Sequence, residues 1–143
     1  MPNINHPATP QPLLVSILRQ RNYLIASIHT ALDDSQMVRF QQDLVGQIGQ
    51  HRARGVIIDV AALDVLDSFA SRTLRNIAEM ARLRGARTVI VGIQPDVALA
   101  MVALGMGTGD VATALDLEEG LAYLDGLLGR TPASGGGPRG TRP

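Results

Sequence analysis

The sequence predicts an α/β fold: a mixed, mainly parallel β-sheet with an N-terminal hairpin and about four helices. Short, continuously apolar runs such as GVIIDV (55–60) and RTVIVGI (87–93) are typical of strands buried on both faces of a parallel sheet. Segments with apolar residues at helical spacing separate these runs. Strands that alternate with helices in this way indicate right-handed crossovers, and the expected order is β-β-α-β-α-β-α-β-α.

The first expected elements are a hairpin and a long helix. LLVSIL (13–18) and YLIASI (23–28) are apolar runs with β-branched residues, separated by the polar RQRN, and this pattern predicts two antiparallel strands. The helix is expected at 33–51, with Asp33 or Asp34 as its N-cap. Its apolar residues form one stripe at helical spacing: Met37, Phe40, Leu44 and Ile48.

Five further elements follow the strand at 55–60. We expect a helix, a buried strand, a helix, a strand and a helix, at about 68–84, 87–93, 94–105, 111–115 and 116–129. Pro95 and Gly105 bracket the second of these helices in the usual order, with proline in the first turn and glycine past the end. Asp116 and Glu119 are the residue pair of a capping box at the start of the last helix.

One domain accounts for this pattern. A chain of 143 residues has room for a single core of useful size. We expect residues 13–128 to form the domain. The polar, proline-rich stretch 1–12 is expected to be a flexible leader, and the Gly, Pro and Arg-rich stretch 129–143 a disordered tail.

Composition argues against several classes of function. The 13 cations are all arginine and balance 13 acidic residues, so the net charge gives no basic surface for nucleic acid or an anionic membrane. The chain has no lysine for a P-loop, a Schiff base or a receiver domain, and no cysteine for a thiolate nucleophile or a disulfide. It also has no apolar run long enough to span a membrane, so we expect a soluble, cytoplasmic protein.

Sequence motifs for catalysis are absent as well. His6, His29 and His51 lack the spacing of a metal motif. The glycine-rich GMGTGD (105–110) follows a helix and precedes a strand, which is the reverse of a phosphate-binding loop, and we interpret it as a helix-to-strand turn. We therefore expect a protein that is not an enzyme and has no catalytic residues, metal or cofactor.

One carboxylate cluster leaves an alternative open. Asp59, Asp64 and Asp67 follow the strand at 55–60, and Asp59 ends that strand, where α/β proteins bind ligands. A ligand-binding domain or an aspartate phospho-receiver is therefore an alternative. The missing lysine and the initial hairpin both count against a receiver, and aspartates commonly cap turns at such positions.

Ser68 stands at the start of the helix expected at 68–84. Either Asp67 or Ser68 suits the N-cap position, and capping alone would explain both residue types. The expected core face of the helix is a stripe of Ala70, Leu74, Ile77, Ala78 and Ala81. A second apolar stripe lies on another side and is covered either by neighbouring helices or by a partner protein: Phe69, Thr73, Met80 and Leu83.

Phosphorylation of Ser68 would change the charge of this helix end. Arg72 and Arg75 follow at spacings of four and seven, which places them near Ser68 on a helix. A phosphate adds about −1.5 to −2 charge, which the helix N-terminus and Arg72 would favour and nearby acids would oppose. A partner that fits the neutral serine would meet new charge and bulk, so Ser68 has the properties of a switch.

Three motifs connect the chain to a known family. LDVLDSF (63–69), GIQP (92–95) and TALDLEEGLAYL (113–124) resemble the STAS domain of bacterial stressosome proteins, specifically the small RsbT antagonists of the RsbS type. The resemblance covers nearly all of residues 13–128. It implies a non-enzymatic scaffold that self-associates and joins RsbR-type paralogues in a large cytoplasmic particle, which holds an RsbT-type serine/threonine kinase.

The same resemblance implies a role for Ser68. In the family, stress prompts the kinase to phosphorylate the serine of this motif and then to leave, which activates a stress signalling pathway. By position the acceptor is Ser68. The surrounding switch surface that binds the kinase would consist of Asp64, Asp67, Phe69, Arg72 and Arg75.

Details of the motifs favour the RsbS type over its relatives. Simple anti-sigma factor antagonists have Asp-Ser-Ser-Gly where this chain has Asp67-Ser68-Phe69-Ala70. RsbR paralogues carry an N-terminal sensor domain and a second acceptor threonine, and this chain has Val91 at the threonine position. An antagonist that binds an anti-sigma kinase without a large particle remains an alternative.

Overall fold

The computed structural model describes residues 13–129, which form five strands and four helices in the predicted order. The strands are β1 (Val15–Gln20), β2 (Tyr23–Ile28), β3 (Gly55–Asp59), β4 (Arg87–Val91) and β5 (Ala112–Ala114). The helices are α1 (Asp34–His51), α2 (Ser68–Leu83), α3 (Pro95–Ala103) and α4 (Leu117–Leu128). The expected leader at 1–12 and the expected tail beyond Gly129 lie outside the described residues, as does His6.

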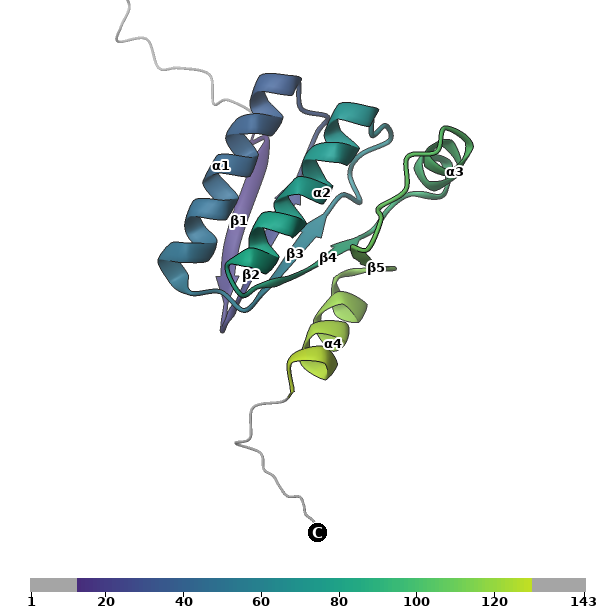
Figure 1. The fold of residues 1–143 in the computed structure, drawn as a ribbon. Helices are drawn as coiled ribbons and strands as arrows, with labels where there is room; N and C mark the ends of the chain where they lie inside the picture. Colours follow the sequence, from purple (N-terminus) through teal and green to yellow (C-terminus); the bar gives the residue numbers. More distant parts are fainter. Residues whose placement is uncertain (1–12, 130–143) are drawn as a thin grey trace, which may run out of the picture.

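The strands form one mixed sheet in the order β1-β2-β3-β4-β5, shown in Figure 1. β1 pairs with β2 in antiparallel orientation and the other neighbours are parallel. The predicted α/β fold with an N-terminal hairpin is therefore confirmed. The hairpin turn is shorter than the predicted RQRN: β1 continues to Gln20, and only Arg21 and Asn22 connect the strands. A two-residue turn suits the twist of paired strands, and Arg21 adopts a φ of 56° to make it.

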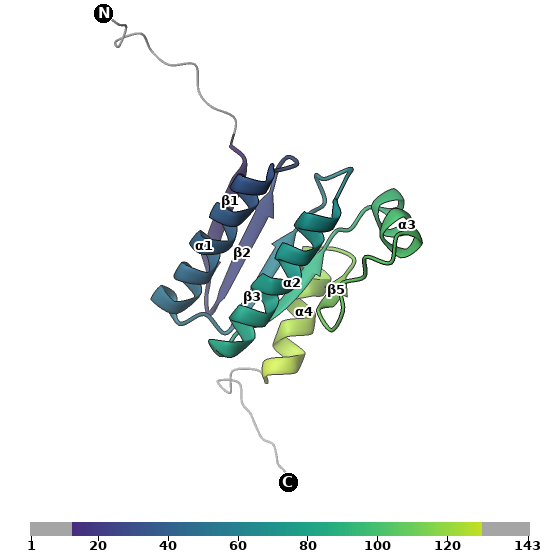
Figure 2. The ribbon, with the colours of Figure 1, turned by 45° about the horizontal axis from the view of Figure 1, so that its top comes forward.

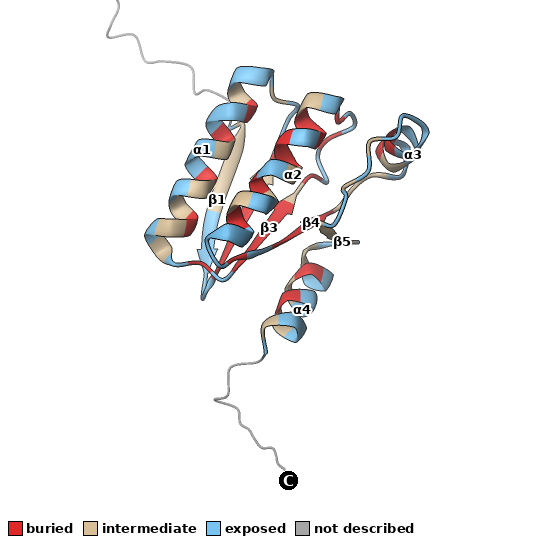
Figure 3. Cartoon of the chain, viewed as in Figure 1, coloured by how far each residue is buried: buried red, intermediate tan, exposed pale blue. Residues whose placement is uncertain are grey.

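Helices cover both faces of the sheet. α1 and α2 lie on one face and α4 on the other, as Figures 1 and 2 show. Alternate residues of each central strand point to opposite faces, so Val56 and Ile58 pack under α1 and α2 while Ile57 packs against α4. Figure 3 shows the buried residues along these strands and on the inner helix faces. Burial on both faces explains why β3 and β4 are continuously apolar in sequence.

The predicted caps of α1 and α4 are formed, with one change. Asp33 caps α1 in a full capping box with Gln36, and the predicted apolar stripe of α1 is buried. Asp116 caps α4 by accepting a hydrogen bond from the Glu119 amide at 2.9 Å. The Glu119 carboxylate accepts from the amide of Leu115, one residue before the N-cap, so the predicted capping box is displaced by one residue.

The carboxyl ends of the parallel strands carry the segments that hold the predicted site residues. The loop after β3, the start of α2, and α3 gather at this end of the sheet (Figures 1 and 2). Gly92 leaves β4 with a φ of 84°, and a Cβ atom there would lie 2.8 Å from the Cβ of Ala61. Gln94 Nε2 donates a hydrogen bond to the Ala61 carbonyl at 2.7 Å. These contacts hold the loop after β3 against the segment that leads to α3.

Candidate functional site

The loop between β3 and α2 is anchored at both ends and in its middle. The Asp59 carboxylate accepts a hydrogen bond from the Ala61 amide at 2.9 Å, and the Val60 amide donates to the Val91 carbonyl at 3.0 Å. The side chains of Leu63 and Leu66 are buried in the core under α1 and α2. The start of α2 is therefore presented from a fixed position.

Asp67, and not Ser68, caps α2. Asp67 has extended backbone geometry, and its Oδ1 accepts a hydrogen bond from the Ala70 amide at 2.8 Å. Ser68 is the first residue of the helix and is exposed. Its hydroxyl makes no hydrogen bond to any other residue in 13–129. Of the two predicted candidates the structure thus selects Asp67, which leaves the Ser68 hydroxyl free.

The charged residues near Ser68 fall into two groups. Asp64 and Arg72 are exposed, and neither forms an ion pair within the described part of the chain. Arg75 is half-buried, and its Nη1 donates a hydrogen bond to the Gly107 carbonyl at 2.9 Å. Arg75 therefore ties α2 to the segment after α3. Arg72, which has no ion pair among the described residues, is the arginine available to pair with a phosphate on Ser68.

The second apolar stripe of α2 is only partly exposed. Phe69 is half-buried against the core under α1 and α2, and Thr73 is buried, with its hydroxyl donating to the Phe69 carbonyl at 2.8 Å. Met80 is half-buried, whereas Leu83 is 78% exposed. Leu83 lies 15 residues along the helix from Ser68, or about 22 Å at 1.5 Å per residue. Packing inside the domain covers much of this stripe, and no continuous apolar face extends from Ser68.

Exposed apolar side chains lie instead on other elements at the carboxyl end of the sheet (Figure 1). Val65, in the loop before α2, is 55% exposed. On α3 and directly after it, Leu99, Val102 and Leu104 are 70%, 80% and 71% exposed, while Val97 and Met101 on the other side are buried. Sequence analysis missed this surface because α3 is apolar on nearly every side, which gives no sign of the side that packs inward.

The other candidate groups are the aspartates at and after the end of β3 and two histidines, His29 and His51. Among residues 13–129 no group of three or more His, Asp or Glu side chains is placed to hold a metal ion, so Asp59, Asp64 and Asp67 do not together form a metal site of this kind. His29 Nε2 lies 3.1 Å from the Ser16 hydroxyl, and His51 Nδ1 lies 3.3 Å from Arg19 Nη1. No helix in this part of the chain has the length and apolar character needed to cross a membrane.

Comparison with known proteins identifies the family. Residues 15–118, well over half of the chain, match the STAS domain. The protein belongs to the STAS domain family. The predicted resemblance and the predicted fold class are both confirmed by this match. The short helix-to-strand connection at 105–110 also agrees with the prediction, since α3 ends at Ala103 and β5 begins at Ala112.

Within the STAS family, the chain is similar to stressosome proteins. A serine-to-glutamate variant of RsbS from Moorella thermoacetica is 34% identical, with a TM-score of 0.70 over 80% of this chain and 97% of that chain. A chain from a structure describing the molecular architecture of the stressosome is 32% identical, with a TM-score of 0.65 over 80% and 99% of the two chains. These similarities identify a STAS protein of the stressosome and anti-sigma factor antagonist group.

A longer relative shows the same relationship. The RsbT co-antagonist protein RsbRA of Bacillus subtilis (strain 168) is 27% identical over 100 residues, which cover 70% of this chain and 36% of that protein. RsbRD, a second RsbT co-antagonist of the same organism, is 27% identical over 95 residues and is matched over 34% of its length. The STAS protein thus spans about a third of the length of these two relatives.

Proposed function

We propose that this STAS protein is a non-enzymatic scaffold that holds an RsbT-type serine/threonine kinase and releases it when Ser68 is phosphorylated. The observation that carries this proposal is the exposed Ser68 hydroxyl, which is free of hydrogen bonds within residues 13–129 and stands at the first position of a helix capped by another residue. A kinase needs such a hydroxyl, because an acceptor already used as a helix cap would first have to leave its partner.

The helix start favours a phosphate at this position. Partial positive charge at a helix N-terminus stabilises an anion in the first turn. Arg72, one turn along and exposed, offers a guanidinium for a charge-assisted hydrogen bond. Asp64 and Asp67 oppose the phosphate, so the modified site would carry a concentrated negative charge at the surface. Such a surface would repel a partner that binds the neutral form.

The proposed kinase surface follows from the exposure of the neighbouring residues. It includes Asp64, Asp67, Arg72 and the exposed part of Phe69 around Ser68. Arg75 contributes indirectly, because its hydrogen bond to the Gly107 carbonyl ties the segment after α3 to α2. We propose further that the protein self-associates and joins RsbR-type paralogues in a large cytoplasmic particle that serves a general stress signalling pathway. Similarity to RsbS, to a stressosome chain and to RsbT co-antagonists supports both proposals.

Phosphate mapping tests the acceptor directly. The protein is incubated with an RsbT-type kinase, Mg²⁺ and ATP, and the labelled residue is located by mass spectrometry. We expect label on Ser68 and none on Ser71, which lies three residues along the same helix and is only 4% exposed. Full labelling of a Ser68→Ala variant would contradict the assignment.

Binding measurements test the switch. We expect Ser68→Ala to retain the affinity for the kinase and Ser68→Asp to weaken it, since every 1.4 kcal/mol of repulsion is a tenfold loss. Equal affinities for the two variants would remove the charge argument.

The large particle is tested by a separate experiment, which measures the mass of the complex formed with an RsbR-type partner. An assembly of only dimer size would favour a simple anti-sigma factor antagonist.

A further inference from the structure

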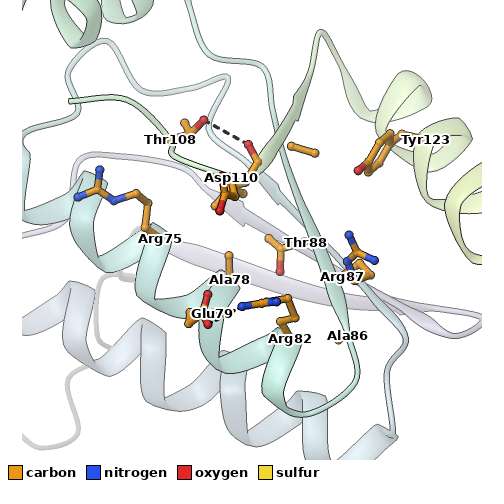
Figure 4. Close-up of a pocket in the computed structure, with 12 residues that line it drawn as sticks. Arg75, Ala78, Glu79, Arg82, Ala86, Arg87, Thr88, Thr108, Asp110 and Tyr123 are labelled. Atoms are coloured by element: carbon orange, nitrogen blue, oxygen red, sulfur yellow. Dashed lines mark hydrogen bonds and ion pairs between the residues drawn. The ribbon is translucent and has the colours of Figure 1, made fainter. Parts of the chain in front are cut away.

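The two edges of the sheet differ in how they are protected. β5 forms one edge, has only three residues, and pairs with residues 89–91 of β4. Side chains of α2, of α4 and of the segment before β5 lie around it (Figure 4). β1 forms the other edge with six residues and pairs with β2 on one side only. A short edge strand is a common protection against pairing with another chain, and β1 lacks that protection.

The unpaired side of β1 presents the backbone groups of Val15, Ile17 and Arg19. The His29 amide donates a hydrogen bond to the Leu14 carbonyl at 2.8 Å, so the backbone groups of Leu14 point toward β2. In an antiparallel pair, alternate residues of a strand direct their N–H and C=O groups to the partner. The register of β1 and β2 has no interruption. The amides and carbonyls of Val15, Ile17 and Arg19 therefore point away from β2, to the open edge.

A groove of about 180 Å³ lies between this edge and α1, which runs along β1 (Figures 1 and 2). Val15 lines the groove from the strand, and Arg39, Phe40 and Asp43 line it from the helix. Asp43 is exposed and forms no ion pair with any residue of 13–129, Arg39 included. The groove therefore suits a long side chain with a positive charge, whose stem would pack beside Phe40 and whose head would meet Asp43.

Leu18 is the exposed apolar residue on the other face of β1. Its partner on β2, Ile25, belongs to the core on the α4 side of the sheet, so Leu18 faces that side as well. Leu18 is 62% exposed. An apolar side chain on an open edge strand is a feature that proteins usually avoid, unless another chain covers it.

We propose that the β1 edge pairs with the β1 edge of a second copy, in antiparallel orientation about a two-fold axis. The inference rests on the self-association proposed above and names the surface that carries it. One register pairs all three outward residues with one another: Ile17 lies opposite its own copy, and Val15 lies opposite Arg19. Each of these pairs exchanges two hydrogen bonds, so the open backbone groups of both strands are satisfied.

This register makes the two copies complementary. Opposite residues of an antiparallel pair point to the same face of the sheet, so Arg19 of each copy lies beside Val15 of the other, next to the groove that holds Asp43. Among the described residues of its own chain, the Arg19 side chain contacts only His51 Nδ1, at 3.3 Å. On the other face the two Leu18 side chains become diagonal neighbours, about 7–8 Å apart and within reach of each other. A second copy thus supplies both the charge and the apolar contact that the edge lacks.

Amide hydrogen exchange tests the edge residue by residue. It is followed by NMR on the full chain at low and at high protein concentration, while sedimentation equilibrium gives the fraction of dimer. We expect the Ile17 amide to exchange rapidly in the monomer and to become protected as the dimer forms. The Leu18 amide, which points to β2, should be protected at both concentrations. Protection of Ile17 in a protein that sediments as a monomer would show that another segment of the chain occupies the edge, and would overturn the proposal.

A charge swap tests the register. Arg19→Asp and Asp43→Arg should each weaken dimerisation about tenfold, because the two-fold axis introduces each change twice and replaces attraction by repulsion. The double variant restores opposite charges and should regain most of the wild-type affinity. Arg87→Asp and Asp110→Arg are the matched controls, since both residues are exposed and neither lies on β1 or lines the groove. They change the net charge by the same amounts and should dimerise like the wild type.

The outcomes separate this proposal from the earlier ones. A dimer whose affinity is the same in the wild type and in both single variants would keep the proposed self-association and overturn the β1 interface. A protein that stays monomeric at every concentration would overturn both. Neither result bears on Ser68, because these experiments contain no kinase.

Discussion

Replacing Asp67 separates the structural role of the α2 cap from recognition of Ser68. The carboxylate of Asp67 accepts the Ala70 amide at 2.8 Å, which satisfies one of the unpaired amides in the first turn of the helix. Asp67→Ala leaves that amide without its partner. Asp67→Asn keeps an acceptor oxygen in the same place and removes only the charge, because asparagine caps helices about as well as aspartate.

The expected magnitude follows from this single bond. Loss of an N-cap acceptor costs roughly 1 kcal/mol, within a range of about 0.5–2 kcal/mol. Unfolding entropy is about 2.1 cal/mol/K per residue, or roughly 0.25 kcal/mol/K for a folded unit of about 115 residues. Asp67→Ala should therefore lower Tm by about 4 °C, and Asp67→Asn by at most about 1 °C.

Thermal and urea unfolding followed by circular dichroism measure these differences. Asp64→Ala is the matched control, because Asp64 is an exposed acid of the same loop with no hydrogen bond to the other described residues. We expect Asp64→Ala to stay within about 0.5 kcal/mol of the wild type. The reasoning is refuted if Asp67→Ala is as stable as Asp64→Ala, or if Asp67→Asn loses as much stability as Asp67→Ala. Kinase assays on the stable Asp67→Asn variant then report on charge alone.

Three further predictions concern packing and ionisation. Burial and the hydrogen bond to Asp125 raise the pKa of Tyr23 to about 12. The neutral phenol therefore stabilises the fold fully below pH 10, and this contribution is lost as the pH rises from 10 to 12. Ultraviolet titration should show Tyr23 ionising near pH 12, and ionisation near pH 10 in the folded protein would contradict this. Gly92→Ala should lower the free energy of unfolding in urea by about 2 kcal/mol or more, because Gly92 has a φ of 84° and an added Cβ would lie 2.8 Å from the Cβ of Ala61. Gly46→Ala is the control: an added Cβ in α1 meets open space, and the variant should be more stable by up to about 1 kcal/mol. Ser71→Ala should stabilise the protein by about 1 kcal/mol in the same assay, because it removes a buried hydroxyl without a partner in the described residues; a loss of stability would reveal a hidden hydrogen bond.

Most of the fold could be predicted from local patterns. The stripe of α1 and the apolar runs of β3 and β4 report burial directly, because helices and strands repeat their side-chain directions at fixed periods. The ends of the strands were harder to predict. β1 begins at Val15, two residues after the predicted start, because pairing with β2 and the turn at Arg21 determine its register. Such pairing depends on contacts that no local pattern contains.

The site was harder to predict because it depends on contacts between distant segments. Residue types left Asp67 and Ser68 equally suited to cap α2, and the backbone geometry decides between them. Helical spacing predicts Arg75 near Ser68, but it does not predict that the Arg75 side chain donates a hydrogen bond to the carbonyl of Gly107, 32 residues away.

The division of roles between Asp67 and Ser68 determines what a phosphate on Ser68 can do. If the serine capped α2, its modification would disturb the first turn, and release of a partner could follow from local unfolding. With Asp67 as the cap, the hydrogen bond to Ala70 does not involve the Ser68 hydroxyl, so a phosphate adds charge and bulk to a helix that keeps its start. The proposed switch therefore acts at the surface, through repulsion and exclusion of the partner, and the fold of the domain is expected to be the same in both states. Phosphorylated and unmodified protein should accordingly give the same far-ultraviolet circular dichroism, and a loss of helix signal on phosphorylation would show that the first turn of α2 takes part in the switch.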